Sequence, residues 1–133
     1  MAHLDGTELD RLWDVDDPAG SEVRFREAAD QADGVMADEL RTQIARAMGL
    51  QGEFAQALTL LDGISTSDAV VQQRIALERG RVLNMAGEVA PAISQLQEAY
   101  RLDADAVLTQ EAIQILEEID IAHADMWRER ANS

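Results

Sequence analysis

The fold is decided by two similar stretches, Gln51-Gly52-Glu53-Phe54-Ala55-Gln56-Ala57-Leu58 and Ala86-Gly87-Glu88-Val89-Ala90-Pro91-Ala92-Ile93. They start 35 residues apart, at positions 51 and 86. In each stretch a Gly-acid pair ends one helical pattern of apolar residues and opens another. Self-similarity at a spacing of this size is typical of repeated helix pairs that stack on one another. The two stretches therefore predict a helical repeat.

The similarity extends to both sides of the two stretches. Upstream, Arg41-x-x-Ile44-Ala45-x-x-Met48 aligns with Ala76-x-x-Arg79-Gly80-x-x-Leu83. Downstream, Ala57-x-x-x-Leu61 aligns with Ala92-x-x-x-Leu96. The small residues in this pattern allow the two helices of a hairpin to approach closely, and the larger ones fill the space beside them. The spacing thus has a physical reason in helix packing.

At these positions the chain resembles the tetratricopeptide repeat (TPR) family. The family pattern is W-x-x-L-G-x-x-Y, then Gly, then A-x-x-x-F, then Pro. Gly52, Gly87, Ala57 and Ala92 match this pattern. The chain departs from it where the family has its aromatic residue and its closing proline, because Arg41, Ala76 and Ala104 stand at those places. Residues 13–26 also resemble the opening of some bacterial TPR-containing proteins of unassigned role.

The resemblance implies an all-α fold, a right-handed solenoid of about four antiparallel helix hairpins. We expect a single domain over residues 1–133, with clear repeats at about 38–68 and 73–105 and degenerate ones at 1–35 and 107–131. The alternative is an irregular helical bundle whose similarity to the repeat is accidental. Apolar periodicity predicts eight helices, at residues 7–15, 21–32, 36–50, 53–62, 68–86, 88–102, 105–118 and 121–131.

The charge and the composition of the chain exclude several classes of partner and of site. The 133 residues carry a formal net charge of −15, every basic residue is Arg, and there is no Cys. An acidic chain repels nucleic-acid phosphates and anionic membrane surfaces, so neither partner is expected. The absence of cysteine excludes disulfides and thiolate metal sites. Without a stretch of about 20 apolar residues or a signal-peptide pattern, we expect a cytoplasmic protein.

No catalytic or metal-binding pattern is present. The two histidines, His3 and His123, lack the spacing of a zinc pair, and His3 falls in a terminus expected to fray. Counting from Asp14, an EF-hand would need Gly and Glu where Ala19 and Phe25 stand. We therefore expect a protein that is not an enzyme and that binds neither a metal nor a cofactor.

By the resemblance, the first helix of each hairpin lines a concave groove that binds a protein or a peptide. The groove positions are Thr42, Arg46, Gly49 and Leu50 in the first repeat, Leu77, Arg81, Asn84 and Met85 in the second, and Glu111 and Ile115 in the third unit. Arg46 and Arg81 occupy equivalent positions and would suit a carboxylate or an acidic peptide. The alternative is that both arginines pair with acidic neighbours in their own chain.

The sequence is also compatible with a second function, self-association. Ile119, Met126 and Trp127 lie in the last predicted helix with few partners after them. They suggest a self-associating structural subunit, a homodimer that buries its C-terminal end. The acid-rich segment Asp5 to Asp17 either caps one end of the stack or occupies the groove of a neighbouring molecule. A groove filled by this segment would favour assembly, whereas an open groove would favour a client.

Overall fold

The chain is all-helical over the part described in a computed structural model, which covers residue 3 and residues 6–131, with side chains as far as residue 122. This part contains seven α-helices. They are α1 (Gly6–Leu12), α2 (Pro18–Asp30), α3 (Gly34–Leu50), α4 (Phe54–Asp62), α5 (Ala69–Met85), α6 (Val89–Leu102) and α7 (Ala106–Ala131). The prediction of eight helices is wrong at the C-terminus, because residues 105–118 and 121–131 belong to one continuous helix.

The start of α2 also differs from the prediction. The helix begins at Pro18, three residues earlier than expected, and the Asp17 side chain caps it by accepting from the Gly20 N–H at 3.1 Å. Proline is favoured in the first turn because no intrahelical partner for its missing N–H is needed there. Ser21, at the predicted start of the helix, is buried, and its Oγ accepts from the Asp14 N–H at 2.8 Å.

The two Gly-acid pairs form the same turn. Gly52 and Gly87 have φ values of 80° and 83°. The residue after each glycine donates back to the preceding helix: Glu53 N–H donates to the Met48 carbonyl at 3.0 Å, and Glu88 N–H donates to the Leu83 carbonyl at 2.9 Å. A residue without Cβ adopts this left-handed conformation at little cost, and the backbone bonds satisfy the carbonyls at the helix end. The tight turns expected after α3 and α5 are thus present.

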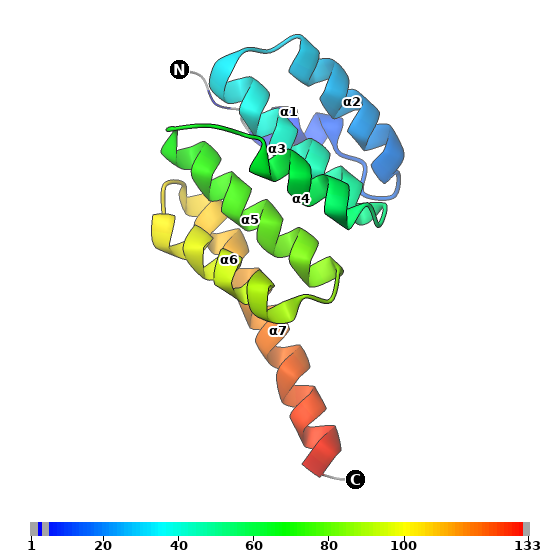
Figure 1. Cartoon of the computed structure of the whole chain (residues 1–133), viewed down its shortest axis with the longest axis vertical. Coiled ribbons are helices and arrows are strands. Elements are labelled where there is room, and N and C mark those ends of the chain that lie inside the picture. The colour runs from blue at the N-terminus through cyan, green and yellow to red at the C-terminus, as the bar shows by residue number, and fades with distance from the viewer. Residues whose placement is uncertain (1–2, 4–5, 132–133) are drawn as a thin grey trace.

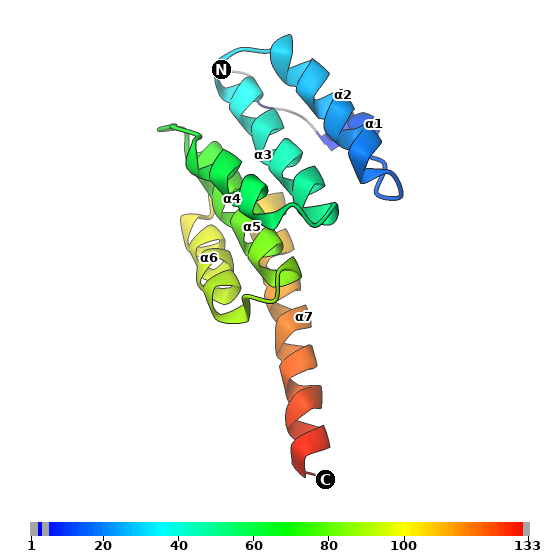
Figure 2. The ribbon, with the colours of Figure 1, turned by 45° about the vertical axis from the view of Figure 1, so that its right-hand side comes forward.

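The helices are layered in the order of the sequence (Figure 1). From α2 onward each helix packs on the next one, and α5 also packs on α3 and on α7. Turned by 45°, the molecule shows α4 and α6 on one side and α7 on the other, with the C-terminal part of α7 projecting beyond the body (Figure 2). The face formed by α3, α5 and α7 positions the candidate site.

Two apolar clusters form the core. The first joins α2, α3, α4 and α5 around the fully buried Phe25, Ala57 and Leu61. The second joins α5, α6 and α7 around Leu77, Leu96 and Ala112. Apolar area removed from water stabilises such clusters by roughly 25 cal/mol per Å².

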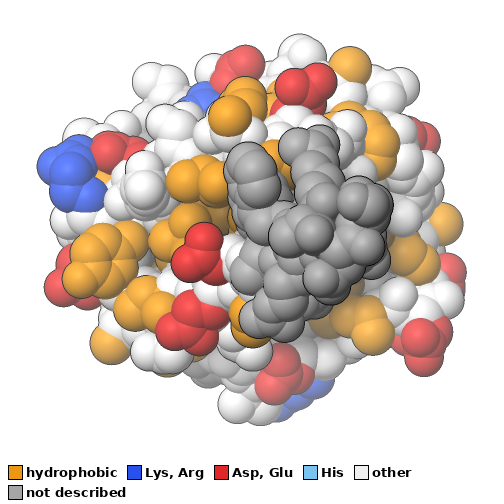
Figure 3. All heavy atoms as spheres, turned by 90° about the horizontal axis from the view of Figure 1, so that it is seen from below, with side chains coloured by type: hydrophobic (Ala, Val, Ile, Leu, Met, Phe, Trp, Pro, Cys, Tyr) orange, Lys and Arg blue, Asp and Glu red, His pale blue; other side chains and the backbone are white. Residues whose placement is uncertain are grey.

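At the end where α7 leaves the body, hydrophobic side chains lie at the surface between acidic ones (Figure 3). Ile121 on α7 is 64% exposed. Within the described residues, no helix combines the length and the apolarity needed to cross a membrane. The expectations for His123, Met126 and Trp127 lie outside the described side chains.

Candidate binding groove

A depression of about 390 Å³ runs across the face formed by α3, α5 and α7. We call it the lower groove. It contains seven of the residues expected to line the groove, two of them on α7, together with two further residues of α7. Its lining is Arg46, Leu50, Arg81, Asn84, Met85, Glu111, Gln114, Ile115 and Glu118. Three helices far apart in the sequence thus contribute to one surface.

Three residues expected in the groove, Thr42, Gly49 and Leu77, do not line it. The Thr42 and Leu77 side chains are 0% and 1% exposed. Thr42 donates its hydroxyl hydrogen to the Glu39 carbonyl within α3, and Leu77 packs in the second apolar cluster. The two residues lie 35 positions apart, in α3 and α5, and both face the core. Gly49 is buried as well.

The arginines of the lower groove are already paired. Glu78, whose side chain is 2% exposed, lies 3.5 Å from Arg81 Nε and 4.0 Å from Arg46 Nε. Arg81 also donates to Glu111 Oε2 at 2.9 Å. Burial lowers the pKa of the Arg46 guanidinium, and the charge of Glu78 opposes that shift. Both arginines therefore pair with acidic residues of their own chain, which is the alternative given for them in the sequence analysis.

A second depression, of about 300 Å³, continues the lower groove toward the N-terminal end. We call it the upper groove. It is enclosed between α1 and the same three helices, and Arg46 and Glu111 line both depressions. Its other lining residues are Gly6, Leu9, Asp10, Trp13, Gln43, Arg74, Glu78, Asp105, Val107 and Leu108. Residues 6–13, which together with His3 we call the N-terminal segment, thus cover this half of the face.

Trp13 fastens the segment to α3. Its indole Nε1–H donates to Gln43 Oε1 at 2.9 Å, and the Arg46 guanidinium lies 4.9 Å from the ring centroid. The ring also meets Phe25 of α2 edge-on, with 4.9 Å between centroids. A cation over an indole face is attracted by the ring quadrupole, most strongly where water is excluded.

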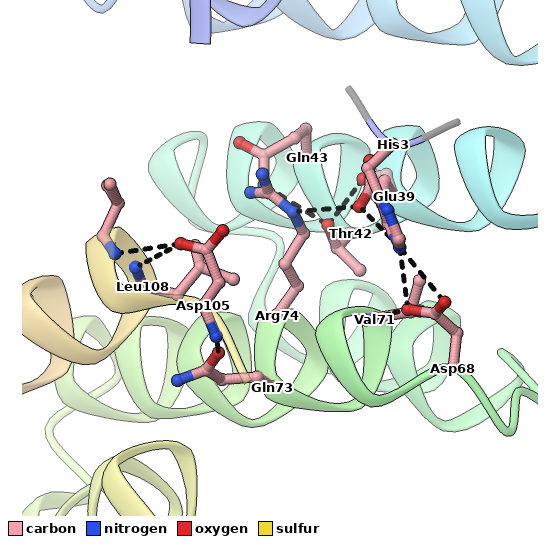
Figure 4. A network of polar contacts seen from close by, with 11 residues as sticks. His3, Glu39, Thr42, Gln43, Asp68, Val71, Gln73, Arg74, Asp105 and Leu108 are labelled. Carbon is pink, nitrogen blue, oxygen red and sulfur yellow. Dashed lines mark hydrogen bonds and ion pairs between the residues drawn. The ribbon is translucent and has the colours of Figure 1, made fainter. Parts of the chain in front are cut away.

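His3, which the sequence places in a terminus expected to fray, makes side-chain contacts with α3 and with the start of α5. Its Nε2 lies 3.0 Å from Asp68 Oδ1, at the start of α5, and 4.0 Å from Glu39 Oε1 of α3 (Figure 4). Asp68 also caps α5 by accepting from the Val71 N–H at 3.0 Å. That backbone hydrogen bond, aided by His3, holds the pKa of the Asp68 carboxyl below its usual range.

Sequence reasoning missed the polar residues that lie between the helices. Glu39, Gln43, Arg74 and Glu78 are buried or nearly so. Arg74 Nε lies 3.7 Å from Glu39 Oε1, which makes an ion pair but is too long for a hydrogen bond. Arg74 and Glu78 are one turn apart on α5, a spacing that could have identified a charged stripe on a helix otherwise read as core.

Two buried polar atoms of the upper groove have no hydrogen-bond partner. They are Arg74 Nε and Glu78 Oε2, and both residues belong to α5. A buried polar atom left without a hydrogen bond costs about 1–3 kcal/mol. The upper groove therefore favours an occupant that accepts a hydrogen bond from Arg74 Nε–H and donates one to Glu78 Oε2.

Among the described residues, no three histidine, aspartate or glutamate side chains converge in a geometry that could hold a metal ion. Comparisons with known proteins add no assignment. No family model matches the chain, and neither curated proteins nor solved structures gave a match.

Proposed function

We propose that the chain is a TPR-like solenoid of helix hairpins that binds a peptide segment of a partner protein in the lower groove. The observation that carries this proposal is the grouping of Arg46, Leu50, Asn84, Met85 and residues of α7 around one depression of about 390 Å³. The equal turns after α3 and α5, and the packing of α5 between α3 and α7, support the solenoid.

The lining favours a particular kind of peptide. Leu50 and Met85 are exposed apolar side chains, and Ile115 lies in the same depression. An apolar side chain of a partner would be removed from water there. Asn84 and Gln114 carry amides that both donate and accept, as peptide backbones require. Because Arg46 and Arg81 are paired with acids, an apolar segment fits better than the acidic one that the sequence suggested.

The test is selection of displayed peptides on the immobilised full chain, followed by calorimetry. We expect Met85→Glu and Asn84→Arg to weaken binding of a selected peptide at least about tenfold, which corresponds to roughly 1.4 kcal/mol. Tyr100→Glu is the matched control, because Tyr100 is exposed on α6 and does not line the groove. Binding that survives both groove substitutions would contradict the proposal.

The alternative function is self-association through α7. Its exposed Ile121 and the projecting end of the helix favour this reading (Figure 2). Light scattering at low and high salt distinguishes the two functions. Under the alternative, the molar mass is twice the 14.6 kDa of the chain and Ile121→Glu returns it to the monomer value. A monomer at both salt concentrations excludes the alternative.

A further inference from the structure

The N-terminal segment occupies part of the face on which a partner would bind. Residues of α1 and Trp13 line the upper groove, and this groove meets the lower one at Arg46 and Glu111. A partner peptide longer than the lower groove would therefore reach α1. In this structure the segment's own side chains take the contacts that such a peptide would need.

The segment is held by a few polar side-chain contacts and by the partial burial of Leu9, Leu12 and Trp13 against the first apolar cluster. Helix α1 has seven residues, and none of them is buried. Isolated helices of this length are unstable in water, so α1 depends on its docking. The two main attachments are the indole of Trp13, on Gln43 and Arg46, and the imidazole of His3, on Asp68. Loss of these few contacts would release the segment.

The segment also fits the upper groove incompletely. Beneath it, Arg74 Nε and Glu78 Oε2 remain buried without a hydrogen bond. An extended peptide could supply what α1 does not, because its backbone carbonyl accepts and its backbone N–H donates. A competing peptide that satisfied both atoms would thus gain interactions that the docked segment lacks.

We propose that His3 and residues 6–13 are an internal competitor of the partner, which must displace them to occupy the full length of the groove. The partner is a peptide that places an aromatic ring where Trp13 lies, between Gln43 and Arg46, and a cationic group where His3 lies, beside Asp68. This proposal rests on the proposed function for the presence of a partner in the lower groove. The docking of His3 and residues 6–13 rests on the contacts described above.

The experiment measures binding of a synthetic peptide with the sequence of residues 1–16, labelled at its C-terminus, to the full-length chain by fluorescence anisotropy. A tethered segment competes at an effective concentration in the millimolar range, so we expect weak binding to the natural chain. In the Trp13→Ala chain the internal segment loses its indole, and we expect the peptide to bind at least about tenfold more tightly.

Three further variants make the result specific. Tyr100→Ala, an aromatic residue outside both grooves, serves as the control and should bind the peptide as weakly as the natural chain. Trp13→Phe keeps a ring against Phe25 but loses the donation to Gln43, so it should give an intermediate affinity even if Trp13→Ala does not fold. Adding Arg46→Gln to the Trp13→Ala chain should remove the gain.

Changes in the peptide test the chemistry of the partner without touching the fold. A peptide carrying Trp13→Ala should not bind the Trp13→Ala chain. His3→Lys should bind as well as the parent peptide or better, and His3→Ala should bind several-fold more weakly, because the site beside Asp68 favours a cation.

Equal affinity of the parent peptide for the natural and Trp13→Ala chains would overturn the inference. If the binding of selected peptides were still weakened by Met85→Glu, the proposed function would stand although the internal competitor had been disproved. Tighter binding to the Trp13→Ala chain, with no dependence of selected peptides on Met85, would instead support the internal competitor and overturn the proposed function.

Discussion

Gln73 joins three helices in the C-terminal half of the molecule. Its fully buried side chain donates to the Ala99 carbonyl at the end of α6 at 2.9 Å and to Thr109 Oγ1 at 2.7 Å. Its Oε1 accepts from the Asp105 N–H at 2.8 Å, at the start of α7 (Figure 4). One amide on α5 thus satisfies backbone groups at both ends of the loop between α6 and α7.

This arrangement predicts a large effect of a single substitution. Gln73→Ala leaves the part-buried Asp105 N–H without its partner and leaves the Ala99 carbonyl with the Asp103 N–H alone. We therefore expect it to lower the free energy of unfolding by about 1–3 kcal/mol. Urea unfolding monitored by circular dichroism measures the loss. The control is Gln72→Ala, since Gln72 is the exposed neighbour and should change stability by less than about 0.5 kcal/mol. Equal losses for the two variants would contradict the prediction.

At the scale of helices, α5 and α6 approach each other closely at Gly80. A Cβ placed there would come within 2.6 Å of Leu96 Cγ and within 3.4 Å of the Ala92 carbonyl oxygen. The repeat pattern puts Gly80 opposite Ala92 and Leu96, as expected for a small residue that admits a second helix. The contact explains why a glycine is kept in the middle of a helix, where it normally costs about 1 kcal/mol relative to alanine.

Gly80→Ala should therefore destabilise the protein despite the better helix propensity of alanine. Overpacking of this kind costs about 1–3 kcal/mol, which exceeds the gain in propensity. Gly63→Ala is the matched control, because its new Cβ would meet only the Leu60 and Thr59 carbonyl oxygens at 3.5 Å and 3.6 Å. Chemical unfolding of both variants tests the prediction, which fails if Gly80→Ala is as stable as the natural chain.

The helix boundaries show how much of the fold could be predicted from the sequence. Periodicity and the Gly-acid pairs located α3 to α6 to within a few residues, because turns and apolar stripes are local features. The predicted division of the last helix at residues 119–120 is wrong, because no glycine or proline interrupts α7 there. Helix α2 begins before the predicted residue 21 because Asp17 caps it and Pro18 is accommodated in its first turn.

The candidate site could be predicted only in part from the sequence. Arg46 and Arg81 line the lower groove, whereas Thr42 and Leu77, which also lie 35 residues apart, face the core. A shift of one position around a helix rotates a side chain by about 100°, so the pattern alone left the face uncertain. The covering of the groove by the N-terminal segment depends on contacts between residues 65 positions apart, such as His3 and Asp68, which local pattern cannot reveal.

At the scale of the whole molecule, charge is unbalanced. The chain has 26 acidic and 11 basic residues. Most of the described arginines are already ion-paired, for instance Arg26 with Glu22 and Arg79 with Asp62. The remaining carboxylates repel one another across the surface, and such self-repulsion destabilises a compact state. Paired charges at the surface contribute little in comparison, about 0–1 kcal/mol each.

Added salt should therefore raise the stability of this protein. Between about 0.01 M and 0.5 M NaCl the screening length falls from roughly 30 Å to below 10 Å, which removes most of the repulsion between separated carboxylates. We expect the midpoint of thermal unfolding to rise by about 3–6 °C, equivalent to roughly 1 kcal/mol. Calorimetry in NaCl and in KCl at equal ionic strength tests this, because screening gives the same rise in both, whereas binding of a particular cation does not. A fall in the midpoint would mean that the ion pairs around Glu78 and Glu39 outweigh the net charge, and that screening them weakens the contacts between α3 and α5.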